Sequence, residues 1–170
     1  MLAFVKVLIA AAVFGLSAHY GFKASKKYAE RELYFSELVL FCRSLAGEIG
    51  FMRAPLPLIF EKYAAAFKSA LAAQLKAAGD LIGADDAIDE KNLWAALPRG
   101  SLRPTEYDAV LAFFNGLGKS DAENQIGSAA GFRAAFDEYH KQTLADKKKF
   151  APLYWKLGLL GAGAVVILIL

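Results

Sequence analysis

The residues best suited to chemistry include a run of carboxylates in the middle of the chain. The run consists of Asp85, Asp86, Asp89 and Glu90. Carboxylate oxygens are the ligands that calcium prefers, and a calcium loop places them in the order D-x-D-x-D-G with a glutamate at the twelfth position. This run lacks that order, so we expect no metal site here.

No other arrangement of reactive side chains predicts catalysis. The 170 residues include one cysteine, Cys42, and two histidines, too few for a disulfide framework or a Cys/His metal centre. His140 stands among charged residues, where we expect it to be exposed. The sequence contains no Ser/His/Asp arrangement and no G-x-x-x-x-G-K-[ST] phosphate loop. We therefore expect no enzyme, no cofactor and no small-molecule substrate.

A polar string separates two helical patterns late in the chain. Its order is Leu117-Gly118-Lys119-Ser120-Asp121-Ala122-Glu123-Asn124-Gln125. Gly118 can adopt the left-handed conformation that closes a helix, and Ser120 with Glu123 forms a capping box for the next one. The amides of Asn124 and Gln125 either hold this turn or contact a partner, and we favour the structural role.

The elements that position these residues begin with the two ends of the chain, which are both apolar. Hydrophobic residues make up 56% of the chain. Residues 2–22 contain one lysine, Lys6, and would rise about 31 Å as a helix, the thickness of a bilayer core. A cleavable signal peptide is the alternative, but its positive charge should precede the apolar run, whereas Lys23, Lys26 and Lys27 follow it. We predict a transmembrane helix over residues 1–22.

The other end predicts a second, shorter span over residues 151–170. Residues 157–170 are uninterrupted and would rise about 21 Å, so crossing requires Lys156 to extend to the headgroups. The basic residues before this span are Lys147, Lys148 and Lys149. Both lysine clusters lie on the side of residues 23–150, which places that domain in the cytoplasm and both termini outside. Lipid headgroups explain these clusters better than nucleic acid does. With Lys6 and Lys156 set aside, the other 18 basic residues nearly match 17 acidic ones, and the positive groups cluster by the membrane.

The cytoplasmic part begins as a long helix. No proline interrupts residues 22–52, and a helical seam runs through Leu38, Cys42, Leu45, Ile49 and Met52. The helix should end before Pro55. We expect Glu37 and Arg43 to be solvated, and Glu48 to be exposed or paired.

Four further helical segments follow in order. Residues 57–79 carry Phe60, Ala64, Phe67, Leu71 and Leu75 at helical spacing, and residues 93–97 predict a short helix anchored by Trp94. Thr105 with Asp108 opens a helix whose buried face is Tyr107, Val110, Leu111, Phe114 and Leu117. The last helix continues this pattern through Ile126, Ala129, Phe132 or Arg133, Phe136 and Tyr139, and runs into the membrane with a bend at Pro152.

These elements predict an all-α fold: a membrane-tethered antiparallel helical bundle with two long helices continuous with the N- and C-terminal transmembrane spans. Small residues at Ala11, Gly15 and Ala18, and at Gly158 and Ala162, would let the spans pack on each other or on another membrane protein. The helical seams could be filled within one chain or between chains of a homo-oligomer.

The order of several motifs resembles one family. The motifs are Arg31 before Glu48-Ile49, Pro55-Leu56, Trp94, the string Leu117-Gly118-x-Ser120-Asp121-x-x-Asn124-Gln125, Lys148-Lys149, and Leu157-Gly158-x-Leu160-Gly161. In this order the chain resembles the stage III sporulation protein AB family, small membrane proteins of endospore-forming bacteria. The polar string is the most specific part.

The resemblance implies membership of the channel complex built between mother cell and forespore, in the mother-cell membrane facing the forespore. The family is similar to the inner-membrane platform protein of type II secretion and type IV pilus systems, which receives a hexameric motor ATPase. The expected partners are therefore the sporulation ATPase, protein AA of the same set, and other membrane proteins of the complex. The alternative is a membrane-associated adaptor or regulator without a motor.

The docking surface is expected at the end of the bundle, about 45 Å from the membrane if two arms of some 30 residues are continuous. The candidate structural or docking residues are Glu48, Pro55, Leu56, Trp94, Leu117, Gly118, Ser120, Asp121, Asn124 and Gln125.

Overall fold

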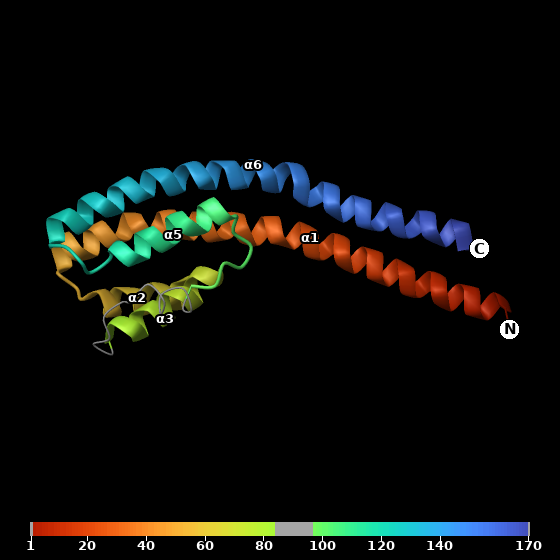
Figure 1. The fold of residues 1–170 in the computed structure, drawn as a ribbon, viewed down its shortest axis with the longest axis horizontal. Coiled ribbons are helices and arrows are strands. Elements are labelled where there is room, and N and C mark those ends of the chain that lie inside the picture. The colour runs from red at the N-terminus through yellow and green to blue at the C-terminus, as the bar shows by residue number, and fades with distance from the viewer. Residues whose placement is uncertain (1, 84–96, 170) are drawn as a thin grey trace. The chain divides into compact units, whose positions relative to one another are not determined.

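The computed structural model describes residues 2–83 and 97–169, and within them the side chains of residues 6–81, 97–161 and 163. These residues form helices and no strands, so the all-α prediction is confirmed (Figure 1). The helices are α1 (Leu2–Gly47), the π-helix η1 (Glu48–Met52), α2 (Leu56–Ala66), α3 (Ala70–Gly83), α5 (Pro104–Gly116) and α6 (Ala122–Ile169). Trp94 lies outside the described residues, as do the four carboxylates at 85–90.

The chain divides into two compact units. One, called the bundle below, is Glu30–Gln142, and the other, the two-helix unit, joins Met1–Ala29 with Thr143–Leu170. This division does not locate a membrane, so the predicted boundaries at residues 22 and 151 stay predictions.

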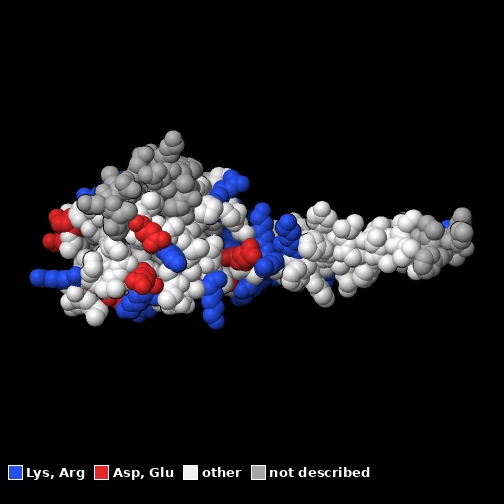
Figure 2. All heavy atoms as spheres, turned by 90° about the horizontal axis from the view of Figure 1, so that it is seen from below, with Lys and Arg blue, Asp and Glu red and all other residues white. Residues whose placement is uncertain are grey.

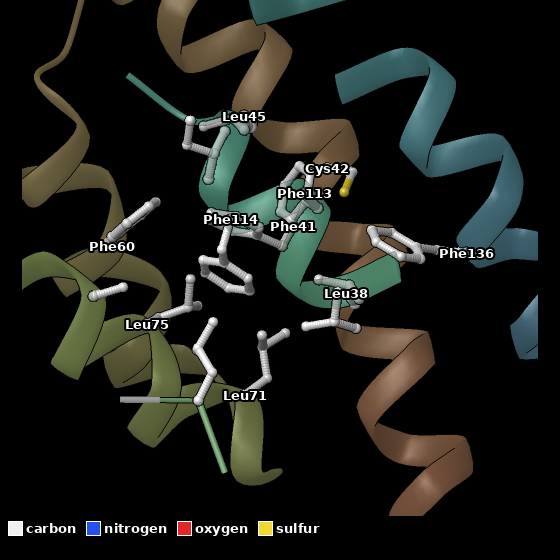
Figure 3. Packing of buried hydrophobic residues seen from close by; sticks show 14 of the residues in the cluster. Leu38, Phe41, Cys42, Leu45, Phe60, Leu71, Leu75, Phe113, Phe114 and Phe136 are labelled. Carbon is white, nitrogen blue, oxygen red and sulfur yellow. The ribbon is translucent and has the colours of Figure 1, made fainter. Parts of the chain in front are cut away.

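Aromatic rings fill the core of the bundle (Figure 3). The Phe41 ring centroid lies 5.7 Å from that of Phe60 on α2 and 6.2 Å from that of Phe113 on α5. Phe113 in turn meets Phe136 of α6 edge to face at 5.5 Å. Burying each such side chain contributes about 1.5–3 kcal/mol. The core therefore joins α1, α2, α5 and α6 around one aromatic centre.

The seam of α1 is confirmed for Leu38, Cys42, Leu45 and Ile49, which are buried. It is wrong for Met52, which is 69% exposed. Residues Glu48–Met52 form a π-helix, whose wider i to i+5 turn rotates later side chains away from the α-helical line. The chain leaves this turn at Arg53, which is left-handed with φ 47°, and the helix ends before Pro55 as predicted.

The predicted single helix over residues 57–79 is two helices, α2 and α3, because the backbone opens at residues 67–69. Glu37 of α1, expected to be solvated, accepts hydrogen bonds there from the backbone N–H groups of Lys68 (2.8 Å) and Ser69 (3.0 Å). These are free N–H groups where α3 begins, which a carboxylate stabilises. The second helix also continues through Gly79, since α3 ends at Gly83.

The buried face of α5 is confirmed in full: Tyr107, Val110, Leu111, Phe114 and Leu117 are all buried. Its predicted start is wrong. The helix begins at Pro104, and the Glu106 carboxylate accepts a hydrogen bond from the Arg103 N–H at 2.9 Å. Glu106 therefore satisfies the backbone of the first turn that Thr105 and Asp108 were expected to cap.

The α6 face follows the predicted spacing. Ala129 and Phe136 are buried, Ile126, Phe132 and Tyr139 pack partly buried against the core, and Arg133 is exposed. Phe132 is therefore the core residue of the two alternatives. Pro152 lies inside α6, which continues to Ile169.

Within the two-helix unit the helices touch backbone to backbone. A Cβ at Gly21 would lie 2.8 Å from the Gly158 Cα, and the Ser17 hydroxyl donates a hydrogen bond to the Gly158 carbonyl at 3.2 Å. Gly158 was predicted at such a contact. A Cβ at Gly15 would meet no described atom within 4 Å, so packing of Gly15 on another membrane protein stays a prediction. Small residues let helices approach this closely.

One helical segment among the described residues, Lys6–Met52, is long and apolar enough to cross a membrane. This finding rests on length and composition alone, which a signal sequence also satisfies. The second predicted span includes side chains that the structure does not describe, and it stays a prediction.

Candidate functional site

Two turns meet at one end of the bundle and bring the predicted docking motifs together (Figure 1). A Cβ at Gly118 would lie 3.4 Å from Cδ1 of Leu56, and one at Gly50 would lie 3.3 Å from Cδ1 of Ile126. Residues 48–58 and 117–126 therefore form one surface, called the turn end below. Gly118 has φ 78°, which confirms the left-handed conformation expected of it.

The polar string holds the start of α6, but through a different residue than expected. The Asp121 carboxylate accepts hydrogen bonds from the Asn124 N–H at 2.8 Å and from the Asn124 side-chain amide at 3.1 Å. Ser120 contributes its carbonyl, which accepts from the Gln125 amide at 2.7 Å. Asp121 is therefore the N-cap, and the predicted Ser120–Glu123 capping box is wrong.

Only the nitrogen of the Gln125 side-chain amide forms a hydrogen bond. Its nitrogen donates to Ser120, whereas its Oε1 is buried and has no hydrogen-bond partner in the described part of the chain. A buried acceptor without a partner costs free energy. Asn124 beside it is exposed, so the string offers both a structural amide and an accessible one.

Large apolar side chains are exposed at the same turn end. Phe51 is 92% exposed, Met52 69% and Leu58 56%. Exposed apolar residues gathered in one place are typical of interaction surfaces. The sequence analysis did not single out Phe51 and predicted that Met52 would be buried. An α-helical period cannot reveal the π-helical turn that directs both side chains outward. Gly47 and Gly50, weak helix formers within four residues of each other, are the available signal.

The open alternative for Glu48 is resolved as pairing. Its carboxylate accepts a hydrogen bond from the Lys62 ammonium of α2, and Glu48 is 11% exposed. This hydrogen bond raises the pKa of Lys62. Lys62 itself is exposed, so the contact orients the end of α2 more than it stabilises it.

A second polar group lies inside the bundle. Arg31 of α1 donates from Nε to Glu106 Oε2 at 2.8 Å and to Oε1 at 3.1 Å, and its Nη2 also contacts Oε1. Both side chains are at most 5% exposed. Arg31 was noted in the sequence only as the head of a helix, and Glu106 was missed, because their partnership spans distant segments.

Two buried tyrosines tie the 97–103 connection to the helices. Tyr34 donates to the Gln74 Oε1 at 2.6 Å, and the Gln74 amide donates to the Pro98 carbonyl at 3.0 Å. Tyr107 donates to the Leu97 carbonyl at 2.6 Å. Burial raises the pKa of both hydroxyls. They therefore act as neutral hydrogen-bond donors, which suits structure and not proton transfer.

His140 is not an exposed lone histidine as expected. Its Nε2 lies 3.3 Å from Glu32 Oε1, and the ring is 27% exposed. The free thiol among the described residues, Cys42, is buried, and burial raises its pKa to about 12. Among the described residues no group of three or more His, Cys, Asp and Glu side chains could hold a metal ion.

A comparison with known families decides the membership of the chain. The profile of the family described as stage III sporulation protein AB (spore_III_AB) matches residues 6–170. The chain belongs to this family. No curated protein and no solved structure matches it. Membership implies a role in stage III of sporulation, and the family is one of sporulation proteins and not a known enzyme family.

The lysine clusters of this family member belong to the two-helix unit. They are Lys23, Lys26, Lys27, Lys147, Lys148 and Lys149. Tyr28 brings the two segments together, since its ring stacks on those of Phe150 and Tyr154 at 5.6 Å each. The unit carries eight lysines and one aspartate, against twelve basic and sixteen acidic residues in the bundle. Positive charge is thus concentrated beside aromatic rings, as at membrane interfaces.

Proposed function

We propose that this chain is a non-enzymatic membrane platform component of the channel complex between mother cell and forespore. In this role the bundle lies in the cytoplasm and docks the motor ATPase of the complex through the turn end. The two-helix unit holds the protein in the mother-cell membrane, with its lysines at the cytoplasmic headgroups.

The observation that carries this proposal is the exposure of Phe51 at the turn end. Phe51 is 92% exposed, yet its turn is held by the Glu48–Lys62 contact and by the approach of Gly50 to Ile126. An exposed aromatic side chain can bury a large apolar area in a partner pocket, which makes it a strong anchor.

The position of the turn end within the bundle also suits docking. The bundle begins at Glu30 and ends at Gln142, and Glu32 and His140 lie side by side there. From Glu30 to Gly47, α1 rises about 26 Å. The turn end is thus the end of the bundle remote from both of its chain connections, where a large partner meets no obstruction from them.

The docking surface is tested with full-length chain copurified with the sporulation ATPase, protein AA. Phe51→Ala should lower ATPase recovery at least about tenfold, because a buried aromatic anchor is worth about 2 kcal/mol or more. Leu40→Ala is the matched control, since Leu40 is a half-exposed apolar residue of α1 outside the turn end. Equal recovery with both variants would reject this surface.

Gln125 offers a second probe of the same surface. Gln125→Ala removes one hydrogen bond and one unsatisfied acceptor, so folding stability should change by less than about 1 kcal/mol. Loss of ATPase recovery at unchanged stability assigns the amide to docking, whereas loss of folding assigns it to the turn.

The topology is tested by an enzymatic reporter inserted after Gly83. A reporter enzyme that functions only in the cytoplasm should be active when it is inserted at this position. Activity on the outside would reverse the orientation and exclude docking of a cytoplasmic motor. Correct topology, sporulation arrest on deletion and no ATPase recovery would together favour the adaptor role.

A further inference from the structure

A groove runs along the surface of the bundle between α2 and α3. It has a volume of about 960 Å³, and its apolar end is formed by Pro55, Pro57 and Leu58. Leu58 is 56% exposed at this end. Pro55, Pro57 and Leu58 belong to the turn end, so the groove begins at that surface. This is more space than a single anchoring side chain occupies.

Small side chains form the walls of the groove. Ala64 and Ala65 line it from α2, and Ala72, Ala73 and Gly79 line it from α3. Such small side chains let the backbone of another element approach closely. Surfaces of this kind accept the apolar face of a helix, whose aliphatic side chains at i, i+4 and i+7 fill the space between two helices.

Charged side chains border the groove without pairing. Glu61 on α2, and Lys76 and Asp80 on α3, line it, and all three are exposed. They form no hydrogen bond or ion pair within the described part of the chain. On the face shown in Figure 2, acidic and basic side chains lie close together over the bundle. Among the lining residues that the structure describes, two carboxylates against one ammonium leave the rim acidic, so a basic partner is complementary.

We propose that this groove binds an amphipathic α-helix of a partner protein, aliphatic on the inserted face and carrying basic residues beside Glu61 and Asp80. An acidic residue of the same helix would face Lys76. This inference rests on the proposed function in one respect: it supplies a second contact for a partner docked at the adjoining turn end.

The occupant is tested in the full-length chain in sporulating cells, with the photo-crosslinking residue benzoylphenylalanine at Ala73. The matched control carries it at Ala134, on an exposed part of α6. Irradiation should give a strong adduct from position 73 and little from 134. Sequencing of the crosslinked peptide should show a helical repeat of aliphatic residues with lysine or arginine along one edge. An adduct to lipid, to a second copy of this chain, or to an acidic segment overturns the proposal.

The charges are tested by E61K with D80K in the same crosslinking chain. The adduct should fall about tenfold, which corresponds to about 1.4 kcal/mol. E138K on exposed α6 is the control and should leave it unchanged. Both variants must retain the melting temperature of the parent chain, which exposed substitutions allow. An adduct that survives E61K with D80K overturns the proposal.

Recovery of the motor ATPase from the same cells separates the two proposals. A basic helix crosslinked at position 73 without ATPase recovery would retain the groove and reject the motor-docking role. ATPase recovered equally with and without E61K and D80K, with no helical adduct, would retain the docking role and reject the groove.

Discussion

Arg31 and Glu106 form a bidentate ion pair inside the bundle, although 75 residues separate them in sequence. The Arg31 Nε donates a hydrogen bond to Glu106 Oε2 at 2.8 Å. Glu106 Oε2 also accepts from the Arg103 N–H at 2.9 Å. One carboxylate thus fixes the start of α5 and joins that helix to α1.

Removing one partner of this pair should be strongly destabilising. Glu106→Leu leaves the Arg31 charge buried without its carboxylate, which costs about 3–5 kcal/mol, a large part of the about 5–15 kcal/mol that stabilises a domain. The double variant R31M with E106L carries no buried charge and should recover most of that loss. Urea unfolding of the full chain in detergent, followed by circular dichroism, measures both. A double variant no more stable than E106L would contradict this account.

The N-cap of α6 can be assigned by adjacent substitutions. Asp121→Ala should cost about 1 kcal/mol, because Asp121 accepts the Asn124 N–H. Ser120→Ala should change stability by less than about 0.5 kcal/mol, since only the Ser120 carbonyl is used. Thermal melts should place the Asp121 variant about 2–4 °C lower. A larger shift for the Ser120 variant would restore the capping box predicted from sequence.

Cys42 predicts a loss of stability in alkali. Burial raises the pKa of its thiol to about 12, an effect that Arg133 only partly opposes. The unfolded chain releases this proton above about pH 9 while the folded chain retains it, so stability should fall as pH rises from 9 towards 12, by up to about 1.4 kcal/mol per unit. Cys42→Ala should reduce the slope between pH 9 and 10, and the slope that remains belongs to the buried Tyr34 and Tyr107, whose pKa is also raised. An unchanged slope in that variant would contradict the assignment.

The same burial predicts that Cys42 is inert towards maleimide at pH 8, so introduced cysteines can report on the two-helix unit. With cysteines at Tyr28 and Phe150, whose rings stack at 5.6 Å, a short bis-maleimide should link the two helices. Gly158→Leu should abolish the link, because a Cβ there would lie 2.8 Å from the Gly21 Cα. Gly15→Leu is the control. A persistent link in the Gly158 variant would exclude the backbone contact.

Helical periodicity predicted which helix faces pack in the core. It could not predict the features that depend on tertiary contacts. Val110 and Phe114 fall on one face by spacing alone. The break between α2 and α3 depends on Glu37, a residue more than thirty positions earlier, and no local pattern in residues 57–79 contains it. Glu106 was not predicted either. Carboxylates are rarely buried unless they are paired, and the partner of Glu106, Arg31, lies far away in the sequence.

The candidate site shows the same division. The approach of Leu56 to Gly118 followed from the order of helices and from the glycine that turns the chain. The outward turn of Phe51 did not, because it depends on five residues of π-helix. Ser120 and Asp121 are both good capping residues, and backbone geometry alone selects the second.

Binding of the motor ATPase to the wild-type chain tests the central claim most directly. Full-length protein is reconstituted into lipid nanodiscs, and purified protein AA is titrated against it. The account predicts saturable binding that Phe51→Ala weakens at least about tenfold and Leu40→Ala leaves intact. Absence of binding to the wild-type chain, with the bundle folded and its cytoplasmic face accessible, would contradict it.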